Sequence, residues 1–301
     1  MSKIINYLKE STKIVKERIN CYIKTKKNIH PILSQAMLYS INSGGKGIRP
    51  ALAFIVYEML SGNNKKDIID AASAIEMIHT YSLIHDDLPA MDNDDLRRGK
   101  PTNHKVYGEG IAILAGDALL TDAFHIISNS KKLSTQIKSE IIRVLSFRAG
   151  SSGMISGQTM DLLSEGKIFN QKKAREVLRY IHFHKTADMI IASAEIGAIA
   201  ANSLPKTIEK IRKIVEKAGL IFQIIDDVLD VVGDKKKLGK KGSDLENKKL
   251  TFVSAYGIDK SKKIAEDLFK DITIEIEKIE GKKEKKELLK NLIELFLRRD
   301  K

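Results

Sequence analysis

The sequence predicts an all-helical protein, and three observations support this fold class. Apolar residues recur at helical spacing along most of the 301-residue chain, and no segment alternates polar and apolar residues for long enough to form a strand. The chain contains only five prolines, so few helices should be interrupted. It has no tryptophan and only 6% aromatic residues, which favours long helices over many short strands. No internal repeat or domain-scale linker stands out, so we expect residues 1–301 to form a single domain.

The expected helices follow one another along the chain. Their apolar residues lie three or four positions apart, as with Ile4 and Leu8 near the N-terminus. Further helices are expected at about 66–87, 110–130, 134–149, 172–200, 206–231, 260–280 and 284–298. Glycines 44, 45 and 47 mark a turn, and Pro89 should end the helix that reaches Asp87. Residues 231–249 form the longest polar connection, which we interpret as a loop over a site.

The composition is typical of a protein that folds around a large core in a reducing compartment. Hydrophobic residues make up 43% of the chain and charged residues 30%, enough for both a core and a solvated surface. The single cysteine, Cys21, excludes an intrachain disulfide framework. The N-terminus becomes charged too soon for a secretory signal, and the nearest candidate membrane span, residues 51–60, is about half the required length. We therefore expect a cytoplasmic protein without stable membrane insertion.

The net charge of +13 restricts the possible partners. The basic residues occur in short scattered clusters, such as Lys235–Lys237 and Lys282–Lys283, without the aromatic-interleaved stripe typical of nucleic-acid binding. We interpret most of them as a solvated surface and expect no nucleic-acid partner. A few of these cations should still bind an anionic ligand.

The strongest chemical signal is the segment Asp226-Asp227-Val228-Leu229-Asp230. Asp226 and Asp230 are four residues apart, so on a helix their carboxylates share one face, about one turn of ~5.4 Å pitch apart. Like charges at this spacing destabilise a bare helix slightly, and a cation between them removes that cost. The segment therefore predicts a cation site near the end of an apolar helix.

A second acidic cluster, residues 85–95, includes Asp86, Asp87 and Asp92. Pro89 should end the helix, so that Asp92 can turn back toward Asp86. Oxygen ligands without a histidine–cysteine set favour magnesium over zinc, and magnesium needs only one or two protein carboxylates. Either cluster alone could be an acidic helix cap or a solvated turn. Two such clusters, each closing an apolar helix and followed by basic residues, favour metal binding.

Several basic residues are placed where they could hold the phosphate groups of a ligand. Arginine offers a planar fork for phosphate oxygens, and a glycine-rich turn allows close approach to an anion. A cation within a long apolar helix needs a counter-charge. Each of these residues alone could be a surface cation, but together they predict an anion site. They are Arg97 and Arg98 after the first acidic cluster, Lys46 and Arg49 at the glycine turn, Lys185 beside Thr186, and Lys240 and Lys249 after the second cluster.

In the order and spacing of these motifs, the chain resembles the trans-isoprenyl diphosphate synthases, most closely those of the bacterial farnesyl diphosphate synthase type. The matching segments are Gly44–Pro50, Glu76–Arg98, Ala115–Asp117, Gly157-Gln158 with Asp161, Lys185-Thr186, Phe222–Asp230, Leu238–Lys240 and Asp244–Thr251. The resemblance implies a helical bundle around a central cavity and a homodimer. It also implies magnesium-dependent head-to-tail condensation of isopentenyl diphosphate with an allylic diphosphate, dimethylallyl or geranyl.

The resemblance further implies a role for each candidate residue. The implied sets are Asp86, Asp87, Asp92, Asp226 and Asp230 for three magnesium ions; Arg97, Lys185, Thr186, Gln223, Lys240 and Lys249 for the allylic substrate; Lys46, Arg49, His79 and Arg98 for isopentenyl diphosphate; and Lys185, Thr186 and Gln223 as the catalytic residues, of which Thr186 and Gln223 would line the developing allylic cation. In such a reaction, stabilisation of the departing diphosphate is the main catalytic task, and the cation left behind requires a closed apolar pocket. Gln158 and Asp161 should face this pocket in roles that the motifs do not assign.

Product length is expected to depend on Tyr81 and Ser82, which precede Asp86 by five and four residues. One to two turns below the metal site, they could form the floor of a tunnel for the growing chain. In similar proteins an aromatic residue here accompanies the fifteen-carbon product, so we predict farnesyl diphosphate. Tyr81 could instead simply pack in the core. A geranylgeranyl diphosphate synthase is the closest alternative function. A class I terpene cyclase is a more distant one, against which the paired acidic motifs and the absence of tryptophan argue, and a basic helical binding protein is a third.

Overall fold

The computed structural model describes residues 2–61, 63–232 and 252–298. These residues are almost entirely helical, which confirms the predicted fold class. The sheet structure within them is a two-stranded antiparallel hairpin, in which β1 (Leu96–Arg97) pairs with β2 (Lys100–Pro101). The hairpin follows directly after the first acidic cluster, and it positions the two arginines of that region.

The helices agree closely with the predicted ranges, most of their ends lying within three residues of expectation. In chain order they are α1 (Ser2–Thr25), α2 (Pro31–Asn42), α3 (Ile48–Ser61), the 3₁₀ turn η1 (Lys65–Ile68), α4 (Ile69–Asp86), α5 (Asn103–Tyr107), α6 (Glu109–Ser128), α7 (Thr135–Ala149), α8 (Met154–Ser164), α9 (Gln171–Ile181), the π-helical segment η2 (His182–Ala187), α10 (Asp188–Ala200), α11 (Pro205–Val232), α14 (Phe252–Tyr256), α15 (Ile258–Glu277) and α16 (Lys283–Leu297).

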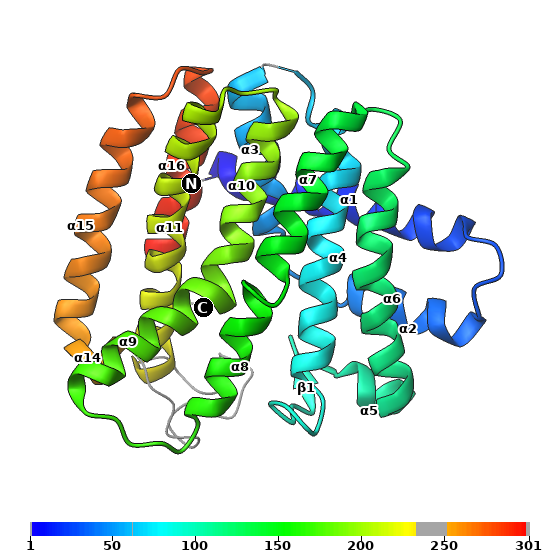
Figure 1. Cartoon of the computed structure of the whole chain (residues 1–301), viewed down its shortest axis with the longest axis horizontal. Helices are drawn as coiled ribbons and strands as arrows, with labels where there is room; N and C mark the ends of the chain where they lie inside the picture. Colours follow the sequence, from blue (N-terminus) through cyan, green and yellow to red (C-terminus); the bar gives the residue numbers. More distant parts are fainter. Residues whose placement is uncertain (1, 62, 233–251, 299–301) are drawn as a thin grey trace.

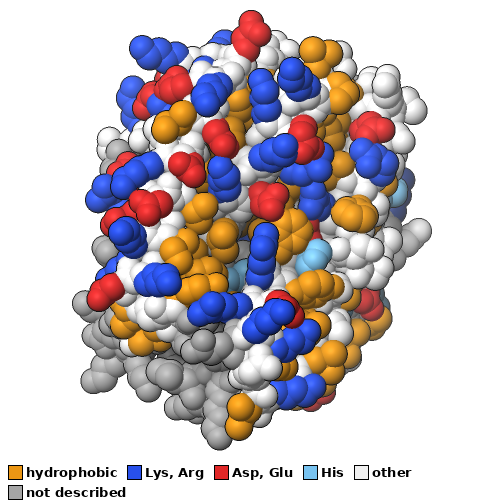
Figure 2. Space-filling view, turned by 60° about the vertical axis from the view of Figure 1, so that its left-hand side comes forward, with side chains coloured by type: hydrophobic (Ala, Val, Ile, Leu, Met, Phe, Trp, Pro, Cys, Tyr) orange, Lys and Arg blue, Asp and Glu red, His pale blue; other side chains and the backbone are white. Residues whose placement is uncertain are grey.

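The long helices lie side by side, with α1 and α2 crossing behind one side of them (Figure 1). α4 contacts α1, α3, α6 and α10, while α10 contacts α3, α7 and α11. Residues 70–78 of α4 and residues 188–199 of α10 are buried on every side. A helix without a solvated face belongs at the centre of a bundle. These two helices therefore form the middle of the core. On the surface, acidic and basic side chains are interspersed over the face on the α15 side, which Figure 2 turns toward the viewer.

The end of α4 turns as the sequence predicts. The last helical residue is Asp86, and Pro89 follows three positions later. The chain then folds back, so that the backbone N–H of Asp92 donates to the carbonyl oxygen of Asp86 at 2.9 Å. Because proline cannot continue the helical hydrogen-bond pattern, the turn is a local consequence of this sequence. It places two aspartates of the first cluster next to each other.

The predicted helix over 172–200 is confirmed in its extent, because helical structure runs without a break from 171 to 200, but it is not one regular α-helix. The structure divides this range into α9, the π-helical turn η2 and α10. A wide turn of this kind is rare and often occurs at functional sites. Neighbouring backbones crowd η2: a Cβ atom on Gly157 would lie 2.1 Å from the backbone nitrogen of Lys185, and one on Gly219 would lie 2.8 Å from the Cβ of Ala187. The glycines thus allow α8 and α11 to hold η2 at close range.

Helix α6 is more apolar than the sequence interpretation recognised. Among the described residues it is the one helix whose length and composition would allow it to cross a membrane, and 44% of its most apolar window is buried. Two aspartates, Asp117 and Asp122, interrupt its apolar run, so the sequence shows no long uninterrupted apolar segment there. The helix packs against α4, α2, α5 and α7 in the bundle.

Candidate active site

A cavity of about 470 Å³ lies between α4, α6, α8 and η2. It brings together residues that are far apart in the sequence and that the motifs had predicted for one site. These are Arg49, His79, Tyr81, Ser82, Asp86, Lys185 and Thr186. Gln158 was also expected to face the pocket, whereas the remaining lining residues were not predicted from the sequence; they are Leu83, His85, Met91, Asp117, Leu120, Met154, Ile155, Thr159 and Leu162. The cavity therefore combines charged groups with an apolar wall.

The environment of Asp86 disfavours its ionised carboxylate, which makes this group suited to binding a cation. Burial raises the pKa of Asp86 to about 6, and the neighbouring charges of Asp92 and Asp87 add to the rise, whereas Lys185 and Arg97 oppose it. A carboxylate pushed toward protonation by burial and by like charges gains most from a divalent cation. Asp86 and Asp92 thus fit the one-or-two-carboxylate chemistry of magnesium.

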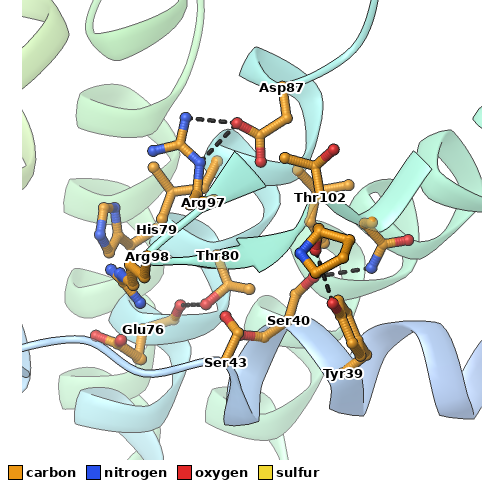
Figure 3. Close-up of a pocket in the computed structure, with 14 residues that line it drawn as sticks. Tyr39, Ser40, Ser43, Glu76, His79, Thr80, Asp87, Arg97, Arg98 and Thr102 are labelled. Atoms are coloured by element: carbon orange, nitrogen blue, oxygen red, sulfur yellow. Dashed lines mark hydrogen bonds and ion pairs between the residues drawn. The ribbon is translucent and has the colours of Figure 1, made fainter. Parts of the chain in front are cut away.

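Among the described residues, Asp87, unlike Asp86, forms a close ion pair with an arginine. Its carboxylate is 3% exposed and accepts from Arg97, whose Nε lies 2.6 Å and whose Nη2 lies 2.5 Å from Oδ1. Nη2 also lies 3.6 Å from Asp94. Burial alone would lower the pKa of Arg97, but the hydrogen bond and charge of Asp87 raise it. The structure therefore places Asp87 as a support for Arg97, which Figure 3 shows turned toward it.

Lys185 projects into the cavity from the π-helical turn. Its Nζ lies 2.5 Å from Asp161 Oδ2 on α8, so the counter-charge expected for a cation in an apolar helix is Asp161. Burial tends to lower the pKa of Lys185, but Asp161, Asp86 and Asp92 together raise it. The ammonium group stays charged beside the first acidic cluster. Thr186 lines the same cavity.

A second group of cations surrounds His79, which lines both this cavity and a smaller one beside the hairpin. Arg49 Nη1 donates to His79 Nε2 at 3.2 Å. The pKa of Arg49 is lowered to about 10, mainly by burial, with the charge of Glu76 opposing the fall and that of Arg98 adding to it. Burial and the charges of the neighbouring arginines hold the pKa of His79 well below its usual range. Figure 3 shows Arg98 beside the histidine, with Glu76 below. Crowded, buried positive charge of this kind favours an anionic ligand.

The glycine turn shapes the neighbourhood of Arg98. Gly44 and Gly45 have φ angles of +116° and +125°, which side-chain-bearing residues rarely adopt. Arg98 Nη1 donates to the carbonyl oxygen of Gly44 at 2.5 Å. A Cβ atom on Gly45 would lie 2.8 Å from the same nitrogen. Lys46 is exposed at this turn and borders a separate groove with α1 and α16.

The second acidic motif is described in part. Asp227 is 4% exposed and accepts from the backbone N–H of Phe252 at 2.5 Å and from Gln223 Nε2 at 3.3 Å, so it joins α11 to α14. Its Oδ2 lies 3.4 Å from His182 Nε2, which ties α11 to η2. Asp226 is half-buried on the same helix, but neither it nor Gln223 lines the cavity. The side chain of Asp230, and Lys240 and Lys249 altogether, lie outside the described residues.

The described residues do not form a closed metal cage. Across residues 2–61, 63–232 and 252–298, no group of three or more His, Cys, Asp or Glu is arranged to hold a metal ion. Magnesium does not require one, because it keeps several water and phosphate ligands. The paired Asp86 and Asp92 fit this chemistry, whereas Asp87 is already paired with Arg97.

Gln158 was predicted to face the pocket, but its motif did not assign it a role. Its side chain lines the cavity, and both amide atoms are buried without a hydrogen-bond partner. A buried amide with unmet hydrogen-bonding capacity is costly unless a ligand or water satisfies it. Gly157, the preceding residue, allows α8 to approach η2 closely.

Comparison with known proteins supplies the context for this cavity. The family model for polyprenyl synthetase matches residues 30–292. The chain is 40% identical to a farnesyl diphosphate synthase of Bacillus subtilis, covering 99% of both chains. It is also 46% identical to a chloroplastic geranylgeranyl pyrophosphate synthase large subunit of Arabidopsis thaliana over 78% of this chain and 64% of that one. A crystal structure of a Helicobacter pylori geranyltransferase, complexed with magnesium and isoprenyl diphosphate, superposes with a TM-score of 0.81 at 32% identity, covering 97% of this chain and 98% of that one.

Proposed function

The chain belongs to the polyprenyl synthetase family and is a short-chain trans-prenyltransferase, and from this premise we propose that it makes farnesyl diphosphate. The substrates would be isopentenyl diphosphate and an allylic diphosphate, dimethylallyl and then geranyl. The observation that carries the proposal is the cavity in which Asp86 and Lys185 share a wall with Tyr81. An anionic head group and a limited apolar tail can be held there at the same time.

The charged wall suits the departure of diphosphate. Asp86 and Asp92 would hold magnesium, which supplies positive charge to the leaving group. Lys185, kept charged by Asp161, stabilises the same developing anion from the other side. Arg97 is held in place by Asp87 beside the first cluster, where it would bind the allylic diphosphate.

The second substrate would lie against the cations around His79. Arg49 and Arg98 would bind the diphosphate of isopentenyl diphosphate, and Lys46 would reach it from the glycine turn. Burial is the main cause of the lowered pKa of Arg49, and a bound anion would favour its charged form. His79 stays neutral and accepts a hydrogen bond from Arg49, which orients the guanidinium.

The reaction between the two sites needs protection from water. The leaving diphosphate departs with the electron pair of the allylic carbon–oxygen bond, and the double bond of isopentenyl diphosphate attacks the resulting cation. Loss of a proton, which the released diphosphate can accept, completes the new allylic product. Leu83, Leu120, Met154 and Leu162 line the cavity with apolar side chains and limit access of water to the cation.

The floor of the cavity supports the fifteen-carbon product over a longer one. Tyr81 is 5% exposed, lines the cavity and lies five residues before Asp86 on α4. A rigid buried ring at this depth leaves little room for a longer tail. The relatives include both farnesyl and geranylgeranyl synthases, so the geranylgeranyl product is the second candidate.

Several further features are part of the proposal. We infer three magnesium ions per site, with Asp226 and Asp230 on α11 holding one of them, and Lys240 and Lys249 closing over the diphosphate.

Residues 1–301 would act as one domain, in the cytoplasm and as a homodimer. The exposed Ile113 and Leu114 of α6, 42% and 54% accessible, offer an apolar surface for a second copy. Sedimentation velocity tests the dimer directly.

One experiment tests the function. Purified protein is incubated with magnesium, radiolabelled isopentenyl diphosphate and each allylic primer in turn, and the dephosphorylated products are sized by chromatography. We expect farnesol as the main alcohol from both primers. A main product of twenty carbons would establish the second candidate instead. Product formed from an allylic substrate alone would indicate a terpene cyclase and refute the proposal.

A further inference from the structure

His85 connects the predicted floor of the cavity to the neighbouring helix. It follows Tyr81 by one helical turn on α4, and the two rings meet edge to face, with centroids 5.6 Å apart and planes at 83°. On the other side, His85 Nε2 lies 3.0 Å from the carbonyl oxygen of Ile113 on α6. Since a carbonyl oxygen can only accept, Nε2 carries the proton and donates it. The imidazole is thus held from both sides.

Gly116 makes room for this arrangement. A Cβ atom built on Gly116 would lie 2.2 Å from His85 Nε2 and 2.5 Å from its Cδ2. A side chain of any size there would push the ring out of its seat. Gly116 has no positive φ that would require glycine, so close approach is the physical reason for glycine at this place in α6. The motif Ala115-Gly116-Asp117, which the proposed reaction does not otherwise use, gains a role from this contact.

The two contacts form one chain from α6 to the end of the cavity. Ile113 and Gly116 fix the imidazole of His85, and the contact between the two rings restricts the motion of the Tyr81 ring. Tyr81 could otherwise change rotamer and lengthen the space available to a tail. An aromatic pair of this geometry contributes enough to change an equilibrium by about two- to tenfold.

We propose that His85 is a positioning residue for product length, which acts by holding Tyr81 across the end of the cavity and which depends on Gly116 for its seat. The proposal rests on the proposed function, because it supposes a growing isoprenyl tail in this cavity. It assigns no contact between His85 and the reacting atoms. The Nε2 nitrogen of His85 faces α6 and is already hydrogen-bonded to the backbone of that helix.

The test compares product distributions of four single variants with those of the wild type. His85→Ala removes the ring, His85→Gln keeps an N–H that can reach Ile113, and Gly116→Ala displaces the ring without removing it. Gly110→Ala is the matched control, because it lies on the same helix and its added Cβ would meet nothing within 4 Å. We expect the ratio of longer product to main product to rise about two- to tenfold in His85→Ala and Gly116→Ala. It should rise less in His85→Gln and stay at the wild-type value in Gly110→Ala.

A double-mutant cycle separates positioning from direct contact with the tail. If His85 acts through Tyr81, then His85→Ala should change the product ratio less than twofold in a Tyr81→Ala background. Equal shifts in both backgrounds would overturn the proposal, as would wild-type ratios in His85→Ala and Gly116→Ala when Tyr81→Ala alone lengthens the products. If Gly116→Ala fails to fold, as judged by circular dichroism, the cycle with His85→Ala decides alone. A wild-type main product other than fifteen carbons refutes the proposed function, while the variant-to-wild-type ratio still tests the role of His85.

Discussion

The backbone N–H of Asp92 donates to the carbonyl oxygen of Asp86 at 2.9 Å, so a six-residue separation in sequence becomes a direct contact. Pro89 lies between them and prevents the helix from continuing. The charge of Asp92 then contributes to the raised pKa of Asp86. The turn therefore creates an unfavourable pair of carboxylates, which a bound divalent cation would make favourable.

Asp86→Asn should abolish condensation and stabilise the magnesium-free protein. Burial raises the pKa of Asp86 to about 6, above the value of 3.8 expected for an unfolded chain. The ionised carboxylate therefore costs folding free energy, and this cost grows as the pH rises from 3.8 and is complete above about 6. Asparagine removes it, so unfolding at pH 7.5 should require about 1–3 kcal/mol more than in the wild type. Thermal and urea unfolding without magnesium measure the difference. A difference that persists undiminished toward pH 4 would contradict this origin.

Magnesium binding should weaken in acid. The proton competes for the same carboxylate, so the apparent affinity should be constant well above pH 6 and fall by up to about tenfold per pH unit below it. Isothermal titration between pH 5 and pH 8 gives the profile. A flat profile through pH 6 would mean that the Asp86 carboxylate is not a ligand. Lys185→Met is a useful companion variant, because it removes a charge that lowers the pKa of Asp86 and should move the inflection to higher pH.

Arg97→Ala should destabilise the fold as well as impair the reaction. It leaves the 3%-exposed carboxylate of Asp87 without its arginine partner. Breaking a buried ion pair from one side typically costs about 3–5 kcal/mol. The double variant Asp87→Asn with Arg97→Ala should recover at least half of the loss in unfolding free energy, but not the activity. Equal stabilities of the single and double variants would contradict the role of Arg97 as the counter-charge on which the stability of buried Asp87 depends.

Tyr81→Ala should release longer products. The ring is buried against the cavity, so its loss opens space along the path of the tail. Tyr57→Ala is the matched control, since Tyr57 is equally buried at 5% exposure but lies in α3 and does not line the cavity. Both changes should cost about 3–5 kcal/mol of unfolding free energy. Chromatography should detect twenty-carbon product in quantity only from Tyr81→Ala. If both variants keep the wild-type product, Tyr81 is a core residue and no more.

Gly45→Ala should weaken isopentenyl diphosphate binding selectively. Its φ of +125° disfavours alanine, and the added Cβ would lie 2.8 Å from Arg98 Nη1. We expect the KM for isopentenyl diphosphate to rise about tenfold or more, with little change in the KM for the allylic substrate. Gly99→Ala is the control, because Gly99 also has a positive φ, +75°, but a Cβ there would meet nothing within 4 Å. Equal effects of the two substitutions would attribute the loss to backbone strain rather than to Arg98.

The sequence by itself determined the features that depend on near neighbours in the chain. Helical periodicity predicted most helices to within three residues, and Pro89 predicted the return of Asp92 toward Asp86. The one long-range feature, the cavity shared by Arg49, Asp86 and Lys185, was predicted through the family resemblance that the motifs carry. Such features follow from backbone geometry and from motifs that are read along the chain.

Only the tertiary structure decided which partner each side chain takes. Of two adjacent aspartates, Asp87 pairs with Arg97, whereas Asp86 faces the cavity. The π-helical turn around Lys185 lies where α8 and α11 approach closely at Gly157 and Gly219, and the sequence of residues 182–187 alone does not predict it. The seat of His85 likewise depends on a glycine 31 positions further along the chain. These contacts are set by how closely helices pack, which depends on side-chain volumes from distant segments together and not on the pattern of any one of them.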